Sequence, residues 1–329
     1  LRVTDGDGAT ATDTATVEVA NVAPSVSILA PSDNSNFDFG TVISFQAAAT
    51  DPGDDDISLT AAVSWSSDRD GALGTGGVND VSGLTVGAHV ITASVTDSGG
   101  LSDSASINVT VNNTAPVLAP IGDKTIDELG VLTFTVSATD NDVPANTLSF
   151  SLDPGAPATA TIDATSGQFS WTTTEADGPG NFSITIRVTD DGTPALSDFE
   201  TITVNVNEVN EAPIANDDVF NVTEGESTLP GFNVLGNDTD PDSVTTVLTA
   251  EAFPLGSGPA LDPNFQLNPD GTFSYTHDGS ETASDSFTYR ACDDGEPSLC
   301  SSTATVTITV DTVNDAPVIE GQQPVSTPE

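Results

Sequence analysis

Apolar and polar residues alternate along several stretches of the chain. The clearest stretch is 304–310, where alanine, valine and isoleucine occupy the even positions and threonine the odd ones. Five further stretches alternate in the same way: 91–96, 105–111, 132–138, 182–188 and 202–206. Successive side chains of a β-strand point to opposite faces of a sheet, so one apolar residue at every second position predicts half-buried strands. No stretch has a helical period of useful length, and the pattern predicts an all-β protein.

A short linker of the form Asn-x-Ala-Pro recurs along the chain, at 21–24, 113–116, 210–213 and 314–317. The spacing is roughly 100 residues, which is the length of a small domain and not of a short solenoid repeat. A second feature recurs with the same spacing as the linkers. An alternating strand ends in an aspartate shortly before each linker, at Asp5, Asp97, Asp190 and Asp293. The two features predict a hairpin of a truncated preceding domain at 1–22, complete domains at 23–113, 114–210 and 211–314, and the start of a truncated following domain at 315–329.

The segments within each predicted domain are typical of β-sandwiches. Ile162–Trp171 and Asn268–Tyr275 place turn residues between short apolar stretches, which predicts two hairpins. Several short strands in about 100 residues, punctuated by Gly and Pro, favour Greek-key sandwiches of the Ig type. We expect Trp65 to be the central core aromatic of the first complete domain, with a sugar-stacking surface role as the alternative.

The charge balance is extreme, with 50 Asp plus Glu against 5 Lys plus Arg and a net charge of −45. Such a chain repels nucleic acids and anionic membranes, so cations are the expected partners. One alternative is that the acidity only keeps a secreted protein soluble, although the acids gather at strand ends near the linkers. No apolar run approaches the roughly 20 residues of a membrane span. Leu1 opens in mid-strand without a visible signal peptide, so we expect a piece of a longer chain.

The two cysteines, Cys292 and Cys300, flank a turn of seven residues. If they face each other across a hairpin, a disulfide is geometrically reasonable and implies an oxidising compartment. The alternatives are two unpaired thiols or a metal site, and the absence of a nearby His or third Cys in the sequence argues against the latter.

The acids beside the linkers point to calcium. Ca²⁺ takes six to eight oxygen ligands, and a junction can collect them because loops of two domains and the linker converge there. With these acids and linkers, residues 114–317 resemble the cadherin-like superfamily, including the tandem cadherin-like domains of large bacterial adhesins and RTX-type proteins. Residues 23–113 resemble a PKD-type or bacterial Ig-like domain, through the segment from Trp65 to Asp97.

The cadherin resemblance implies a ligand set for each junction. At the junction between the second and third domains it implies Glu128, Glu175 and Asp177 from above, Glu208, Asn210 and Glu211 from the linker, and Asp240, Asp242 and Asp293 from below. At the first junction it implies Asp140, Asp142 and Asp190 from below, but the domain above has no matching early Glu. Two further sets would serve the outer junctions: Asn21, Asp51, Asp54 and Asp97 above the first domain, and Glu224, Asp311, Asn314 and Asp315 below the third.

Catalysis is not expected. Only His89 and His277 are of the residue type that could act as a near-neutral base, and neither lies beside a nucleophile motif or a phosphate loop. Paired acids also serve in glycoside hydrolysis, but here they recur at every domain end, which suits structure better than one active site.

The resulting hypothesis is a non-catalytic extracellular rod of a bacterial surface adhesin, stiffened by Ca²⁺ and partnered by neighbouring copies or domains. The first alternative is a subunit of a self-assembling filament, sheath or surface layer, since strands at both chain ends could pair between subunits. The second alternative is an array of glycan-binding modules, which would need an exposed aromatic platform.

Overall fold

The computed structural model describes residues 1–226, 231–242 and 247–314, and their regular secondary structure is almost entirely β-strand. Their only helical elements are α1 (Asp56–Ala61) and the short 3-10 turns η1 (Glu175–Asp177) and η2 (Val234–Asn237). The chain divides into two compact units. Unit 1 comprises Leu1–Lys124, Leu132–Trp171 and Phe182–Val204, and unit 2 comprises Thr125–Val131, Thr172–Asn181 and Asn205–Glu329. The predicted following domain at 315–329 lies outside the described residues.

Residues 1–22 include a short hairpin, although the residues 14–20 that were expected as its second strand form no strand. Strands β1 (Arg2–Thr4) and β2 (Thr10–Thr12) pair antiparallel, and every residue of both is exposed. The turn between them is fixed by Asp5, whose side chain accepts hydrogen bonds from the backbone N–H groups of Asp7 and Ala9. A carboxylate that bonds its own turn in this way is the usual role of Asp in a tight loop.

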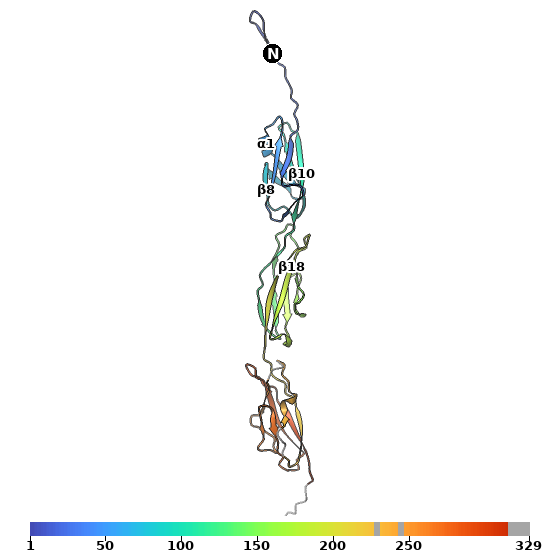
Figure 1. Ribbon diagram of the computed structural model, residues 1–329, viewed down its shortest axis with the longest axis vertical. Helices are drawn as coiled ribbons and strands as arrows, with labels where there is room; N and C mark the ends of the chain where they lie inside the picture. The colour runs from blue at the N-terminus through green and yellow to red at the C-terminus, as the bar shows by residue number, and fades with distance from the viewer. Residues whose placement is uncertain (227–230, 243–246, 315–329) are drawn as a thin grey trace, which may run out of the picture. The chain divides into compact units, whose positions relative to one another are not determined.

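Residues 23–113 form a sandwich of two sheets, coloured blue to green in Figure 1. One sheet has the order β3-β5-β8, with bounds Ser25–Ala30, Ile43–Thr50 and Val78–Val81. The other has the order β4-β10-β9-β6-β7, with bounds Ser35–Asp38, Ser102–Asn112, Gly87–Thr96, Ser64–Ser67 and Gly71–Thr75. Strand β4 runs parallel to β10, and the other pairs of this domain are antiparallel.

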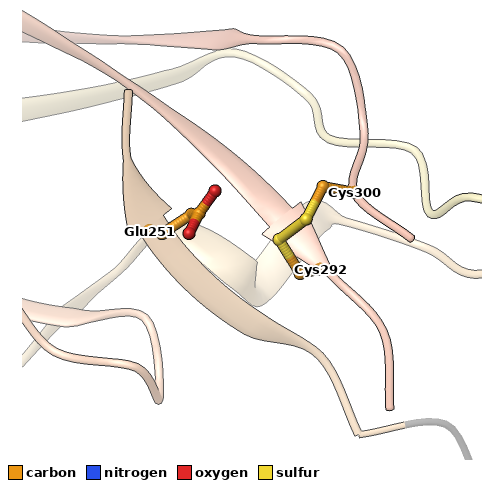
Figure 2. Close-up of side chains that lie close together, drawn as sticks. All are labelled: Glu251, Cys292 and Cys300. Atoms are coloured by element: carbon orange, nitrogen blue, oxygen red, sulfur yellow. A yellow bond between two sulfur atoms is a disulfide. The ribbon is translucent and has the colours of Figure 1, made fainter. Parts of the chain in front are cut away.

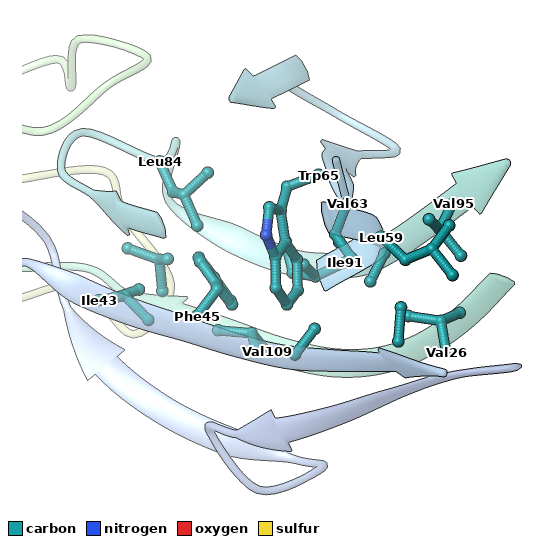
Figure 3. Close-up of a cluster of buried hydrophobic side chains, with 14 residues drawn as sticks. Val26, Ile43, Phe45, Leu59, Val63, Trp65, Leu84, Ile91, Val95 and Val109 are labelled. Carbon is teal, nitrogen blue, oxygen red and sulfur yellow. The ribbon is translucent and has the colours of Figure 1, made fainter. Parts of the chain in front are cut away.

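The core of this sandwich lies between the two sheets, where Phe45 and Trp65 face each other (Figure 3). Their ring centroids are 5.5 Å apart, and the indole Nε1 donates to the carbonyl oxygen of Gly76 at 2.8 Å. Trp65 is 1% exposed, so the prediction of a core aromatic is confirmed and its surface alternative is wrong. Burying one such side chain stabilises the fold by roughly 1.5–3 kcal/mol.

Residues 114–210 form strands of three sheets. The largest has the order β12-β19-β18-β15, with bounds Lys124–Asp127, Ser197–Asn207, Gly180–Thr189 and Ser149–Leu152. A second has the order β13-β17-β16, with bounds Val131–Thr135, Gln168–Thr172 and Thr161–Ile162, and β11 (Val117–Leu118) pairs with β14 (Ala138–Thr139). Strands β16 and β17 form the hairpin predicted at 162–171, with Ile162 opposite Phe169.

Residues 211–314 form the third sandwich. One sheet has the order β20-β26-β25-β22, with bounds Asp218–Thr223, Ala304–Asp311, Ser284–Cys292 and Thr249–Ala252. The other has the order β21-β24-β23, with bounds Phe232–Asn233, Thr272–Ser274 and Gln266–Leu267. Strands β23 and β24 form the second predicted hairpin, and burial alternates along β26 as the threonine pattern requires. The prediction of an all-β protein built from tandem sandwiches is confirmed.

Candidate metal centre

Seven carboxylates form three overlapping groups in unit 2. In each group, one oxygen from every member lies within 4.8 Å of the others. The groups are Glu128 with Glu175 and Glu208, Glu175 with Glu211 and Asp242, and Asp240 with Asp242 and Asp293. Because Glu175 and Asp242 each belong to two groups, the seven side chains form one connected cluster, which we call the acidic cluster.

The upper members of the acidic cluster are fixed by local backbone contacts. Glu128 directly follows β12, its N–H donates to the Asn207 carbonyl at 3.0 Å, and its Oε1 accepts from the N–H of Val209 at 2.7 Å. Only 2% of Glu128 is exposed, and its Oε2 has no hydrogen bond among the described residues. A Cβ on Gly178 would lie 2.3 Å from this oxygen, so glycine is what leaves room for the carboxylate.

Glu175 opens the 3-10 turn η1, and neither of its buried carboxylate oxygens has a partner among the described residues. Asp177, predicted as a ligand, instead caps this turn: its Oδ2 accepts from the N–H of Thr174 at 2.7 Å and from the Thr174 hydroxyl at 2.8 Å. Asp177 joins none of the three groups. Its contribution in the described structure is therefore to hold the turn that presents Glu175.

The lower members are fixed by the linker. The N–H of Glu211 donates to Asp242 Oδ2 at 2.7 Å, and the N–H of Asp242 donates to Asp240 Oδ1 at 3.0 Å. Asp293 accepts at Oδ2 from the Asn210 side-chain amide at 3.1 Å. Asn210, predicted as a ligand, thus positions Asp293 through its amide. The second oxygens of Asp240 and Asp242 are buried without a hydrogen bond among the described residues.

The acidic cluster concentrates negative charge that nothing nearby balances. Among the described residues, no Lys, Arg or His forms an ion pair with any of its seven members. Burial, and then repulsion from Glu128, Glu211, Asp242 and Glu208, raises the pKa of Glu175 to about 7. Burial also raises the pKa of Glu208 and of Asp240, with neighbouring carboxylates adding to the effect. Buried carboxylate oxygens without donors are costly unless a cation binds them, and an all-oxygen set fits a hard cation such as Ca²⁺.

The predicted ligands of the first junction do not come together in this way. Asp140, Asp142 and Asp190 form no group of three carboxylates in the part of the chain that the structure describes. Asp142 instead accepts from the N–H and the hydroxyl of Thr114, at 2.9 and 2.6 Å. Asp190 accepts from the Asn113 side-chain amide at 2.9 Å.

The two outer sets also form no such group among residues 1–226, 231–242 and 247–314. Above the first domain, Asn21 donates its side-chain amide to Asp97 at 2.9 Å, and Asp54 accepts from Ser98. Below the third, Glu224 repeats the arrangement of Glu128, because its Oε2 accepts from the N–H of Val313 at 2.8 Å. Asp315 lies outside the described residues.

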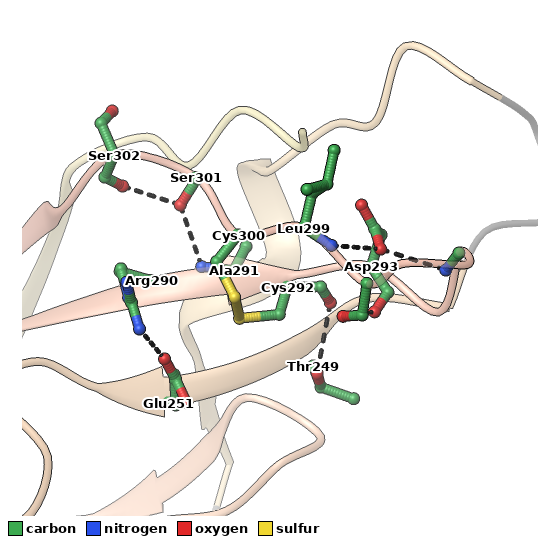
Figure 4. The surroundings of a disulfide bond; sticks show 12 residues. Thr249, Glu251, Arg290, Ala291, Cys292, Asp293, Leu299, Cys300, Ser301 and Ser302 are labelled. Atoms are coloured by element: carbon green, nitrogen blue, oxygen red, sulfur yellow. Dashed lines mark hydrogen bonds and ion pairs between the residues drawn. A yellow bond between two sulfur atoms is a disulfide. The ribbon is translucent and has the colours of Figure 1, made fainter. Parts of the chain in front are cut away.

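The two cysteines are joined by a disulfide (Figure 2). Glu251 lies close to both sulfur atoms, but bonded sulfurs are not available as thiolate ligands. Glu251 instead pairs with Arg290, as Figure 4 shows. Between the cysteines, Asp293 Oδ1 accepts from the N–H groups of Gly295 and Leu299, so the disulfide closes the loop that carries a member of the acidic cluster.

Among the described residues, Ser67, His89 and Asp70 form a Ser–His–Asp arrangement, and its geometry is structural. His89 is 1% exposed, and its Nδ1 lies 2.9 Å from Ser67 Oγ and 3.7 Å from Asp70 Oδ2. A catalytic triad needs the Ser and the Asp on opposite ring nitrogens, whereas here both approach the same one and Nε2 contacts the Thr85 carbonyl. Ser67 is itself buried, so this His fixes a turn inside the core.

A second buried acidic site, which the sequence patterns did not predict, lies in the third sandwich. The hydroxyl of Tyr289, on β25, lies within 3.2 Å of five oxygens, from the Asp218 and Asp238 carboxylates and the backbone carbonyls of Asn216 and Val234. One hydroxyl donates a single proton, so the carboxylates compete for it. Burial, together with Asp238 and Asp217, raises the pKa of Asp218 to about 6. The signal in the sequence is Asn216-Asp-Asp218 followed by Asn237-Asp238, two turn-like segments rich in Asn and Asp.

Asp218 is expected to make the stability of the third sandwich depend on pH. Its pKa is raised in the fold, from 3.8 to about 6, so the folded state binds the proton more tightly. This stabilisation is complete below about pH 4 and is lost as the pH rises through about 6, with an amplitude of about 1 kcal/mol after solvent screening. Urea unfolding in chelator at a series of pH values measures it.

The control for that experiment is Asp218→Asn, which keeps the side-chain volume but does not titrate. The difference in unfolding free energy between the two proteins isolates Asp218, because Glu175 and the other carboxylates titrate in both. A pH-independent difference would contradict the prediction.

Comparison with known proteins matches two of the repeats to protein families. Residues 210–312 match the bacterial cadherin-like domain, and residues 115–207 match a putative Ig domain. The interpretation of the chain as tandem cadherin-like and Ig-like repeats is therefore confirmed.

The curated relatives are protocadherins. The chain is 29% identical over 248 residues to the protocadherin-like wing polarity protein stan of Drosophila melanogaster. This alignment covers 69% of this chain and 7% of that protein. The chain is 33% identical over 167 residues to Protocadherin-23 of Homo sapiens, which covers 43% of this chain and 4% of that protein. Among solved structures, mouse cadherin-23 EC22-24 aligns with a TM-score of 0.45 and 18% identity, over 89% of this chain and 100% of that chain. The chain spans only a small fraction of the length of these curated relatives.

Cadherin-like domains are extracellular, generally bind calcium and are typically non-catalytic, and cadherin repeats commonly contact neighbouring copies. Within the described ranges, no helix is long and apolar enough to cross a membrane.

Proposed function

We propose that this chain is a non-catalytic part of a bacterial surface adhesin, a stalk whose linker at Asn210–Pro213 is stiffened by calcium. The observation that carries the proposal is the acidic cluster, in which buried carboxylate oxygens converge without a basic partner among the described residues. The match of residues 210–312 to a bacterial cadherin-like domain supports the bacterial and extracellular parts of the proposal.

The cluster offers one place for a cation in each of its three groups. Glu175 and Asp242 would each help to hold a cation in two of the groups, since each belongs to two. Calcium would neutralise carboxylates that otherwise repel one another, and it would tie the η1 turn, the linker and the Thr239–Asp242 loop together. Without the cation, the same repulsion would separate them.

Small-angle scattering of the whole chain, in calcium and in chelator, tests the proposal. We expect the maximum dimension to be well defined in calcium, and the distance distribution to broaden when calcium is removed. Glu175→Gln, which removes a charge shared by two groups, should behave in calcium as the parent does in chelator. A matched substitution of an exposed acid away from the cluster, Glu281→Gln, should have no effect. Identical scattering with and without calcium, together with no calcium binding by calorimetry, would reject the stalk model.

The filament and glycan-binding alternatives stay predictions.

A further inference from the structure

The linkers at Asn113 and Asn210 are built on the same hydrogen bonds. Each Asn donates its side-chain amide to an aspartate, Asp190 or Asp293, and to the carbonyl of a proline, Pro194 or Pro297. The next linker residue donates its N–H to a second aspartate, Asp142 or Asp242. That aspartate in turn donates its own N–H to the aspartate two positions earlier, at 3.0 Å in both cases.

The two linkers differ at one position of this common hydrogen-bond pattern, the residue that follows the Asn. After Asn113 the linker has Thr114, whose hydroxyl donates to Asp142 Oδ1 at 2.6 Å. After Asn210 it has Glu211, which brings a further carboxylate and no donor, and Asp242 Oδ1 stays without a hydrogen bond among the described residues. The hydroxyl therefore satisfies the oxygen whose counterpart in the other linker, Asp242 Oδ1, has no hydrogen bond among the described residues.

Further hydrogen bonds stabilise the linker at Asn113–Pro116. Asn146 donates its side-chain amide to Asn113 Oδ1 at 2.8 Å, so the Asn113 amide has partners at both its oxygen and its nitrogen. The N–H of Val86 donates to the Val143 carbonyl at 2.8 Å, which links residues on the two sides of the linker within unit 1. Among the Asn113, Asp142 and Asp190 side chains, none has a buried oxygen or nitrogen without a hydrogen bond, and only the neighbouring Asp140 has one.

We infer that the linker at Asn113–Pro116 is locked by protein hydrogen bonds in place of calcium, with the Thr114 hydroxyl doing what the cation does at Asn210–Pro213. The comparison between the linkers rests on the proposed function, whereas the lock itself depends only on the contacts of Thr114. The chain would then contain two kinds of junction, one permanently fixed and one that opens when calcium is withdrawn. A charge-assisted hydrogen bond at 2.6 Å is among the stronger kinds, which suits a fixed junction.

Amide hydrogen exchange of the full chain, in calcium and in chelator, tests the inference. The N–H groups of Thr114 and Glu211 are equivalent reporters, because both donate to an aspartate. We expect chelation to accelerate exchange at Val209 and Glu211 by about tenfold or more and to leave Thr114 unchanged. The variant Thr114→Val keeps the shape but removes the hydroxyl, and it should accelerate exchange around the linker at Asn113–Pro116 by about tenfold in both conditions.

The outcomes separate the inference from the proposed function. Equal acceleration of both linkers by chelation would overturn the inference while the calcium stalk stands. Unchanged exchange in Thr114→Val would also overturn it. If chelation changes neither linker but Thr114→Val still accelerates exchange at Asn113–Pro116, the lock is supported and the calcium stalk fails. Thr114→Ser, which retains the hydroxyl, should behave like the parent and so controls for folding.

Discussion

Calcium is expected to raise the free energy of unfolding of unit 2 by about 4 kcal/mol once its free concentration is a thousandfold above the dissociation constant. The physical reason is the acidic cluster, whose carboxylates repel one another in the folded state and can separate in the unfolded chain. A cation bound among them turns this repulsion into attraction only when the chain is folded. The effect should be confined to unit 2, because every member of the three groups belongs to it.

The aromatic residues allow the two units to be observed separately in one chain. Both tryptophans, Trp65 and Trp171, belong to unit 1, and both tyrosines, Tyr275 and Tyr289, belong to unit 2. Tryptophan fluorescence therefore reports unit 1 during urea unfolding, and near-ultraviolet circular dichroism in the tyrosine region reports unit 2. We expect calcium to move the tyrosine transition and to leave in place the Trp65 part of the tryptophan signal, which reports residues 23–113.

The variant Asp242→Asn tests the same prediction, because its effect on the free energy of unfolding should have opposite signs in chelator and in calcium. It removes a charge shared by two groups but keeps an oxygen that can accept from the N–H of Glu211. In chelator the variant should be slightly more stable than the parent, because a repulsive charge is gone. In calcium it should be about 2 kcal/mol less stable, because half or more of the calcium stabilisation is lost. Glu281→Gln, at an exposed position of the same sandwich, is the matched control. If both variants respond to calcium alike, the cluster is not the binding site.

The strands could be predicted from sequence because their pattern is local. Along β26, threonines alternate with apolar residues, and burial alternates with them. The hairpins at 162–171 and 268–275 could be predicted for the same reason, since a turn and its two flanking strands lie within ten residues or so. The helix α1 was not predicted, because its six residues are too few to show a period; its one local signal is Asp55, whose side chain accepts from the N–H of Ser58.

The acidic cluster could be predicted only through resemblance, and its details depend on distant contacts. Asp177 illustrates the difficulty: Thr174-Glu-Ala-Asp177 fits both a ligand motif and a capped turn, and in the structure it caps the turn. The difference between the two linkers could not be predicted from the sequence either. Thr114 and its acceptor Asp142 are 28 residues apart, so a sequence gives both residues without showing that one satisfies the other. Tyr289 and Asp238, 51 residues apart, meet only because β25 and the η2 turn pack together.

Removing the disulfide is expected to lower the free energy of unfolding of unit 2 by about 2 kcal/mol. Cys292 and Cys300 are eight positions apart, and closing a loop of that size restricts the unfolded chain by about this amount. The double substitution Cys292→Ala with Cys300→Ala, followed by urea unfolding in chelator, measures the loss. Reduction of the unchanged protein is the control, because it breaks the bond without altering side-chain packing elsewhere. Equal unfolding midpoints for the oxidised and reduced proteins would contradict the prediction.

The same bond should also affect calcium binding, because the loop that it closes carries Asp293. In that loop Asp293 Oδ1 accepts from the N–H group of Leu299 (Figure 4) and from that of Gly295, while its Oδ2 accepts from the side-chain amide of Asn210. A loop freed from the disulfide must be ordered when the cation binds, so part of the binding free energy is spent on ordering it. We expect the reduced protein to bind calcium severalfold more weakly by calorimetry, with the weakening confined to the group of Asp240, Asp242 and Asp293. In Asp293→Asn, where that group is already impaired, reduction should change calcium affinity much less. If reduction weakens binding equally in both proteins, the disulfide acts on the cluster by a route other than Asp293.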